Sequence, residues 1–252
     1  MNNKKVVIIK AGGSSIGSLY DSEKIKEKHS KIYEIINNYS SKGYKVIIVN
    51  SALKGFTRAL IASSFHKEGT AEYHENLAIG ELSTANLLNN NLKAMEIESA
   101  LMNEQQFQHP VNLKKNGNGL EILNVNTQDI YRVLESGYVP IIPGFIGRIH
   151  GRWGTISLDG SDISAIEIGI ALKESKFYGI VEVVLLKDYA IYNKDPKEKD
   201  AKHLPKLHWD EAIALTEVCG DFVHPKGIQK AQASALNINI LTFEGETSII
   251  GN

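Results

Sequence analysis

A glycine-rich turn near the start of the chain carries the first residues that could do chemistry. The apolar run Val6–Ile9 leads into Lys10 and then into Gly12, Gly13 and Ser15. Because glycine has no Cβ, successive backbone N–H groups in such a turn can approach an anion closely. Lys10 adds a positive charge beside them. These residue types favour phosphate binding, and the alternative is an ordinary strand and turn with an exposed lysine.

A second polar turn, Leu158-Asp-Gly-Ser-Asp162, lies far along the chain. It precedes a helix of small residues predicted over 163–171. One interpretation is that Ser161 or Asp162 caps this helix. The other is a second phosphate-facing helix start, at which Asp162 would arrange cations or a metal ion.

Two further groups of polar residues follow the second predicted strand. Ser51 to Thr57 form a small-residue turn directly after residues 45–50, and Gly80-Glu81 interrupts the helical pattern of residues 58–92. A glycine inside a helix costs about 1 kcal/mol relative to alanine, so we expect another group to approach closely there. The alternative is a junction between two helices with Glu81 in solvent.

The elements that must position these turns alternate between strands and helices. The predicted strands cover residues 6–9, 45–50, 93–99, 138–143, 177–186 and 237–243, with a hairpin region at 103–124. The predicted helices cover residues 21–41, 58–92, 127–137, 163–171, 209–219 and 228–236, with Thr127 as an N-cap and Gly137 as a stop. This order predicts an α/β fold with a mostly parallel sheet, whose carboxyl edge is where ligands bind.

The composition limits the classes of protein that fit. The chain has 252 residues and a formal net charge of -1, so no global positive field points to nucleic acid. No apolar stretch approaches the roughly 20 residues that span a bilayer, and the N-terminus lacks a signal-peptide pattern. The only cysteine, Cys219, excludes an internal disulfide, and we expect it in the core. These features predict a cytoplasmic protein.

Taken in order, the motifs resemble those of aspartokinases, which belong to the amino acid kinase superfamily. Lys10-Ala-Gly-Gly-Ser-Ser-Ile16 resembles their KFGGTSV signature, Ser51-Ala-Leu-Lys-Gly-Phe-Thr57 resembles SAMGGVT, and Gly80-Glu81 matches a GE pair. Val139 to Gly147 is similar to VPxVxGFxG, and Thr155-Ile-Ser-Leu-Asp-Gly-Ser-Asp162 aligns without a gap on TLGRGGSD. Lys187-Asp188, Tyr192 and Asp195-Pro196 are similar to TDVDGVYTADPR, and His224-Pro-Lys226 resembles LHPR or LHPK. The resemblance covers almost the whole chain.

This resemblance implies a three-layer α/β/α sandwich around a mostly parallel sheet. Residues 1–147 would form an N-terminal lobe that binds a small amino acid and makes a homodimer. Residues 148–252 would form a C-terminal lobe that binds ATP with Mg²⁺. We expect no regulatory ACT domain in this chain.

The resemblance also implies a role for each matching residue. The residues that would act on the phosphates are Lys10 and Lys226, held in place by Asp162, with Gly12, Gly13 and Ser15 cradling the transferred group. The residues that would face the amino acid are Ser51, Thr57, Glu81, Leu158 and Asp159, with Glu81 pairing the ammonium. The residues that would line the nucleotide site are Lys187, Asp188, Tyr192 and Asp195. No residue is assigned as a metal ligand. Such a site suits phosphoryl transfer, which needs positioning and charge stabilisation more than a strong base.

The chain departs from the aspartokinase pattern where that family binds its acceptor. Leu158 stands in place of an arginine that clamps a substrate carboxylate, and Asp159 adds a negative charge in place of a glycine. Arg58, Arg148 or Arg152 could supply a displaced clamp. These changes lead us to predict a less acidic acceptor, homoserine, with aspartate as the alternative.

Other classes fit the sequence less well. Acetylglutamate, isopentenyl phosphate and uridylate kinases resemble the first glycine-rich turn, but the first two carry a glycine run where this chain has residues 51–57. A catalytically inactive, nucleotide-binding regulator is a third possibility, although Lys10, Asp162 and Lys226 are retained. No GxGxxG motif follows the first strand, which argues against a dinucleotide-binding oxidoreductase.

For His224, beside Pro225, we predict a positional role in the turn.

Overall fold

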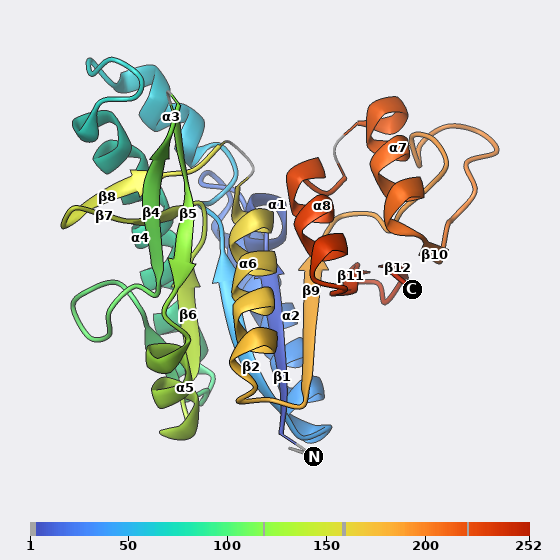
Figure 1. The fold of residues 1–252 in the computed structure, drawn as a ribbon, viewed down its shortest axis with the longest axis horizontal. Helices are drawn as coiled ribbons and strands as arrows, with labels where there is room; N and C mark the ends of the chain where they lie inside the picture. Colours follow the sequence, from blue (N-terminus) through green and yellow to red (C-terminus); the bar gives the residue numbers. More distant parts are fainter. Residues whose placement is uncertain (1–3, 118, 158–159, 221) are drawn as a thin grey trace.

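The computed structural model describes residues 4–117, 119–157, 160–220 and 222–252 (Figure 1). Within them, a central eight-stranded sheet has the order β10-β12-β11-β9-β1-β2-β6-β3. Its strands are β1 (Lys5–Ala11), β2 (Tyr44–Asn50), β3 (Ser99–Leu101), β6 (Val139–Pro143), β9 (Ile180–Leu186), β10 (Lys206–Leu207), β11 (Ile238–Leu241) and β12 (Thr247–Ile250). Every pairing is parallel except β11 with β12, which confirms the predicted sheet.

Helices cover both faces of this sheet (Figure 1). The helices are α1 (Gly13–Ile16), α2 (Ser22–Ser41), α3 (Phe56–Ser63), α4 (Ala71–Ala94), α5 (Thr127–Glu135), α6 (Ser161–Ser175), α7 (Trp209–Cys219) and α8 (Pro225–Ala233). Alternate residues of β1 enter opposite cores, since Val7 and Ile9 pack with α2 and α4 whereas Val6 and Ile8 pack with α5, α6 and α8. The predicted three-layer sandwich is therefore confirmed.

A second sheet, with the order β5-β4-β7-β8, packs against α4. Its strands are β4 (Val111–Asn116), β5 (Gly119–Val125), β7 (Ile146–Ile149) and β8 (Arg152–Thr155). Gly147 allows β7 to lie close to β4, because a Cβ there would be 2.8 Å from Cγ of Leu113. The predicted lobe boundary between residues 147 and 148 falls inside β7. The division into lobes remains a prediction, and this pairing favours a boundary after Thr155.

Gly80 lies inside an uninterrupted α4. A Cβ at this position would be 3.1 Å from Cδ1 of Leu60 in α3 and 3.4 Å from Cβ of Ala52 in the turn after β2. The expected close approach is therefore present, and it brings α3 and the turn after β2 against α4. The adjacent Glu81 is buried, so it does not lie in solvent.

Several local predictions were wrong. The strand predicted over 93–99 begins only at Ser99, the first residue of β3. The residues before it are the end of α4 and a turn, because the helix continues to bury Leu92 and Glu96 then adopts a φ of 64°. Asn126, not Thr127, caps α5, since its side chain accepts a hydrogen bond from the Asp129 backbone N–H. Cys219 is exposed and not part of the core.

No helix in the described ranges is long and apolar enough to span a membrane.

Candidate active site

The carboxyl ends of β1, β2 and β9 meet at one edge of the sheet, as the parallel order predicts. Backbone hydrogen bonds join the ends of β1, β2 and the neighbouring β6. The N–H of Ser51 donates to the carbonyl of Ala11 at 2.9 Å, and the N–H of Gly144 donates to the carbonyl of Asn50 at 2.7 Å. A Cβ at Gly144 would lie 2.9 Å from both the Asn50 carbonyl oxygen and Cβ of Ser161. This packing brings the first turn of α6 to the same edge.

Asp162, in the first turn of α6, lies between two lysines. Its Oδ1 is 2.6 Å from Nζ of Lys10, and its Oδ2 is 2.8 Å from Nζ of Lys187. The Asp162 side chain is only 4% exposed. Burial alone would raise the pKa of this carboxyl, but the two ammonium groups outweigh burial and hold the pKa well below its ordinary value. Asp162 therefore stays ionised and fixes the positions of two cations.

The second lysine of this triad was not predicted correctly. The resemblance to aspartokinases implies Lys226 beside Asp162 and Lys187 at the nucleotide. Lys226 instead lies exposed at the start of α8 and lines a different cavity with Ser157 and Ile163. His224 caps α8 by accepting a hydrogen bond from the Lys226 backbone N–H, so its predicted positional role is correct.

The glycine-rich turn folds closely around Lys10. A Cβ at Gly12 would lie 2.9 Å from Nζ of Lys10, and a Cβ at Gly13 would lie 3.0 Å from the Ala52 carbonyl oxygen. Ser15 does not face this space, because its buried hydroxyl donates to the Leu186 carbonyl at 3.0 Å. Ser14, which the sequence did not single out, is half-buried and lines the neighbouring cavities. The short helix α1 explains the difference, since it turns adjacent hydroxyls in different directions.

A cavity of about 270 Å³ lies on the α4 side of this turn. Its lining includes the predicted residues Lys10, Gly13, Ser51, Thr57 and Glu81, and also Lys54, Arg58, Phe145 and Ser161. We call it the acceptor cavity. The Ser51 hydroxyl donates to that of Ser161 at 2.7 Å, which links the turn after β2 to the first turn of α6. Leu158 and Asp159 lie outside the described residues.

Glu81 is the buried acid of the acceptor cavity. Its carboxylate accepts a hydrogen bond from the Ala52 backbone, but Oε2 has no partner among the described residues. Burial raises the pKa of Glu81 to about 8, although the Ala52 N–H and the charge of Lys10 both favour the ionised form. An unpaired buried carboxyl is costly when it is charged, so this position suits a cationic ligand group.

A second cavity, of about 330 Å³, lies beyond Ser14. The four predicted nucleotide residues line it, namely Lys187, Asp188, Tyr192 and Asp195, together with Tyr189, Pro196, Cys219 and Phe222. We call it the nucleotide cavity. The Tyr192 hydroxyl donates to Glu246 at 2.6 Å, and this bond raises the pKa of the phenol. Gly13 lines the acceptor cavity and Ser14 lines the nucleotide cavity, so the glycine-rich turn separates the two.

Comparison with known proteins identifies the family of the chain. The sequence model described as the Amino acid kinase family matches residues 5–240. The chain belongs to this family. It is 28% identical over 244 residues to an aspartokinase of Thermus thermophilus, a match that covers 93% of this chain and 56% of that protein. It is 30% identical over 254 residues to an aspartokinase of Rickettsia bellii, covering 96% and 58%. The chain thus spans little more than half the length of these relatives.

Solved structures of other members show the same amino acid kinase fold. Aspartokinase III of E. coli, in complex with aspartate and ADP, has a TM-score of 0.81 at 17% identity, covering 98% of this chain and 65% of that one. UMP kinase of Bacillus anthracis has a TM-score of 0.67 at 15% identity, covering 99% and 96%. At these identities the likeness concerns the fold alone.

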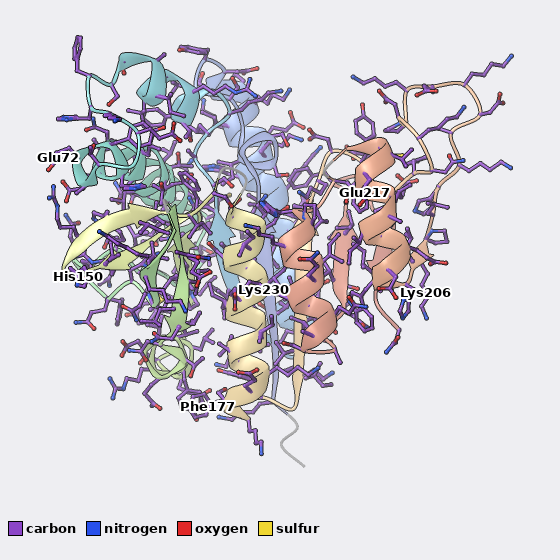
Figure 2. All side chains as sticks on the ribbon, turned by 45° about the horizontal axis from the view of Figure 1, so that its top comes forward. Glu72, His150, Phe177, Lys206, Glu217 and Lys230 are labelled. Atoms are coloured by element: carbon purple, nitrogen blue, oxygen red, sulfur yellow. The ribbon has the colours of Figure 1, made fainter. Side chains whose placement is uncertain are left out.

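The three arginines considered as a displaced clamp differ in position. Arg152 pairs with Glu72 and Glu75 at 2.9 Å, and Figure 2 shows Glu72 at the outer edge of the molecule. Arg148 stacks on Trp153 and lies 3.7 Å from Glu104. Arg58, on α3, is exposed and lines the acceptor cavity. Arg58 is therefore the arginine among these three that can reach a ligand there.

We predict that Asp162→Asn lowers the free energy of unfolding by about 3–5 kcal/mol at pH 7, because it leaves Lys10 and Lys187 without their counter-charge. The pKa of Asp162 is lower in the folded protein than its ordinary value of 3.8. Ionised Asp162 therefore stabilises the fold fully at any pH above 3.8. This stabilisation is lost as the pH falls from 3.8 towards the pKa of the folded protein. The difference between wild type and variant should shrink accordingly.

Urea unfolding at pH 7, 4 and 3 measures this effect, because the loss begins only below the ordinary pKa of 3.8. Glu23→Gln is the matched control, since Glu23 pairs with Lys26 on the surface of α2 and should matter little. Equal unfolding free energies for Asp162→Asn and Glu23→Gln at pH 7 would contradict the assignment.

Proposed function

We propose that this chain transfers the γ-phosphoryl group of ATP to the side-chain carboxylate of aspartate. The observation that carries the proposal is the acceptor cavity, in which the unpaired Glu81 carboxyl and the ammonium of Lys10 line one space of about 270 Å³. A small amino acid has the complementary charges. The names of the relatives, which are aspartokinases, favour aspartate.

The charges of the cavity orient the acceptor. Its ammonium would pair with Glu81, and its reacting group would lie by Lys10 and the glycine-rich turn. Its α-carboxylate would then face Arg58, and a guanidinium can bind a carboxylate through two parallel hydrogen bonds. Lys54 adds a second cation on that side. These two side chains offset the absence of an arginine at position 158.

The triad of Asp162, Lys10 and Lys187 supports phosphoryl transfer by placing cations, not by taking a proton. Both oxygens of Asp162 contact ammonium groups, and its pKa is too low for a base near pH 7. A carboxylate acceptor needs no base, whereas a hydroxyl loses its proton on transfer. This favours aspartate over homoserine. Lys10 and Lys187 would stabilise the charge that builds on the transferred group.

The nucleotide would occupy the cavity lined by Tyr192, Asp195 and Cys219, with its phosphates directed past Ser14 towards Lys187. No cluster of three His, Cys, Asp or Glu side chains that could hold a metal lies within the described residues. Mg²⁺ commonly binds through substrate phosphates and one or two carboxylates, and Asp188 and Asp195 are exposed carboxylates of this cavity that could contribute. When bound, Mg²⁺ would neutralise phosphate charge.

Homoserine remains the second candidate, on the specific grounds of Leu158 and Asp159 in the sequence. An inactive regulator that binds nucleotide is the third. A homodimer through the N-terminal lobe and a cytoplasmic location belong to the proposal as well.

The purified chain should release ADP from MgATP in the presence of aspartate, measured by a coupled assay, with homoserine and glutamate tested separately. Hydroxylamine distinguishes the two products, because it converts a carboxyl phosphate to a hydroxamate and leaves a phosphate ester intact. We expect hydroxamate formation with aspartate. ADP release with homoserine alone, without hydroxamate, would overturn the choice of aspartate. No turnover with any acceptor, with ATP still raising the melting temperature, would indicate the regulator.

Arg58→Ala should raise KM for aspartate about tenfold or more, because a hydrogen bond to a charged group contributes about 1.5–3 kcal/mol. Aspartate α-amide, which lacks the α-carboxylate, should bind poorly and show little further loss in the variant. Arg152→Ala removes the same charge from the outer face of β8 and should leave KM within twofold of wild type. A similar KM for aspartate in both variants would exclude Arg58 as the carboxylate ligand.

A further inference from the structure

A third cavity, of about 590 Å³, opens on the α2 side of the same sheet edge. Four lysines line it, namely Lys24, Lys28, Lys54 and Lys197. We propose that this lysine cavity binds a small molecule bearing at least two phosphate charges, at a site separate from the reacting nucleotide. Lysine binds phosphate as a point charge, so such a site selects for charge more than for shape.

The walls of the lysine cavity are held in place by the fold. Asp21 caps α2 by accepting a hydrogen bond from the Lys24 backbone N–H at 3.0 Å, and Lys28 follows one turn later on the same face. The Lys28 ammonium lies 4.4 Å from the centre of the Phe243 ring. The N–H of Lys54 donates to the Gly17 carbonyl at 3.0 Å, which fixes the opposite wall.

The lysines of α2 divide into two groups. Lys26 pairs with Glu23 at 2.9 Å and Lys31 pairs with Glu27 at 3.0 Å, so α2 neutralises these charges itself. Within the described ranges, no carboxylate lies within ion-pair distance of the four lysines that line the cavity.

Three acids line the rim of the cavity, namely Asp188, Glu244 and Glu246. Glu246 accepts a hydrogen bond from the Tyr192 hydroxyl but keeps its charge. The lysines thus exceed the acids by one charge, and in the described structure none of the four is held in an ion pair with these acids, so their ammonium groups can turn towards an anion.

The lysine cavity also touches the other two cavities. It shares Ser14, Asp188 and Tyr189 with the nucleotide cavity and Lys54 with the acceptor cavity. An anion bound there adds negative charge beside the path of the nucleotide phosphates, so anion and ATP should weaken each other's binding. This coupling rests on the proposed nucleotide site, whereas binding of the anion does not.

Calorimetric titration of the nucleotide-free protein with pyrophosphate tests the site. We expect saturable binding that weakens as salt is added. The double variant Lys24→Ala/Lys28→Ala should raise the Kd about tenfold, since each exposed ion pair contributes up to about fivefold. The double variant Lys26→Ala/Lys31→Ala removes the same charge from the same helix and should change the Kd less than twofold. Absence of saturable binding, or equal losses in both variants, would overturn the proposal.

Competition with ATP separates this site from the nucleotide cavity. Pyrophosphate should raise the apparent Kd of ATP in the wild type and much less in Lys24→Ala/Lys28→Ala. If it displaces ATP equally well from that variant, pyrophosphate binds in the nucleotide cavity itself and the separate site is wrong. Because the first titration contains no ATP or amino acid, its result stands whether or not the chain proves to be a kinase.

Discussion

Burial of two carboxylates at the carboxyl edge of the sheet is the constraint on which the site depends. Asp162 is compensated, because Lys10 from β1 and Lys187 after β9 each contact one of its oxygens. For Glu81 burial outweighs the favourable charge of Lys10, and one of its oxygens has no partner in the described structure. The first carboxylate therefore joins the elements around the glycine-rich turn, and the second leaves a position for a positively charged group. The opposite pKa shifts of the two acids follow from this difference.

Much of the fold could be predicted from the sequence because its strands are near-continuous β-branched runs. The order of strand and helix then brings the turns after β1, β2 and β9 to one edge. Three of the predicted acceptor residues, Ser51, Thr57 and Glu81, line one cavity, and the four predicted nucleotide residues line another. Their roles remain predictions. What the sequence lacked was side-chain direction. Ser15 turns inward where Ser14 does not, and Lys187 replaces Lys226 beside Asp162 because contact is decided by tertiary packing.

The local errors have similar physical causes. Over a few residues, the apolar pattern around Leu92 fits a strand or a helix equally well. The structure has a helix there because the helix buries Leu92 against the sheet. Cysteine is a small, mostly buried residue type, which favoured a position in the core. Cys219 is instead exposed at the end of α7, where it lines the nucleotide cavity. Arg58 was one of three arginines that the sequence could not distinguish, and only their positions in the fold separate them.

Glu81 is proposed to bind the ammonium group of the acceptor amino acid. Release of a proton from Glu81 when aspartate binds tests this most directly. With a pKa of about 8, free Glu81 is mostly protonated at pH 7, and an ammonium partner should ionise it. Calorimetric titration with aspartate in two buffers of different ionisation enthalpy measures this. We predict release of nearly one proton per aspartate at pH 7, falling as the pH rises past 8. A binding enthalpy at pH 7 that does not depend on the buffer would contradict the claim.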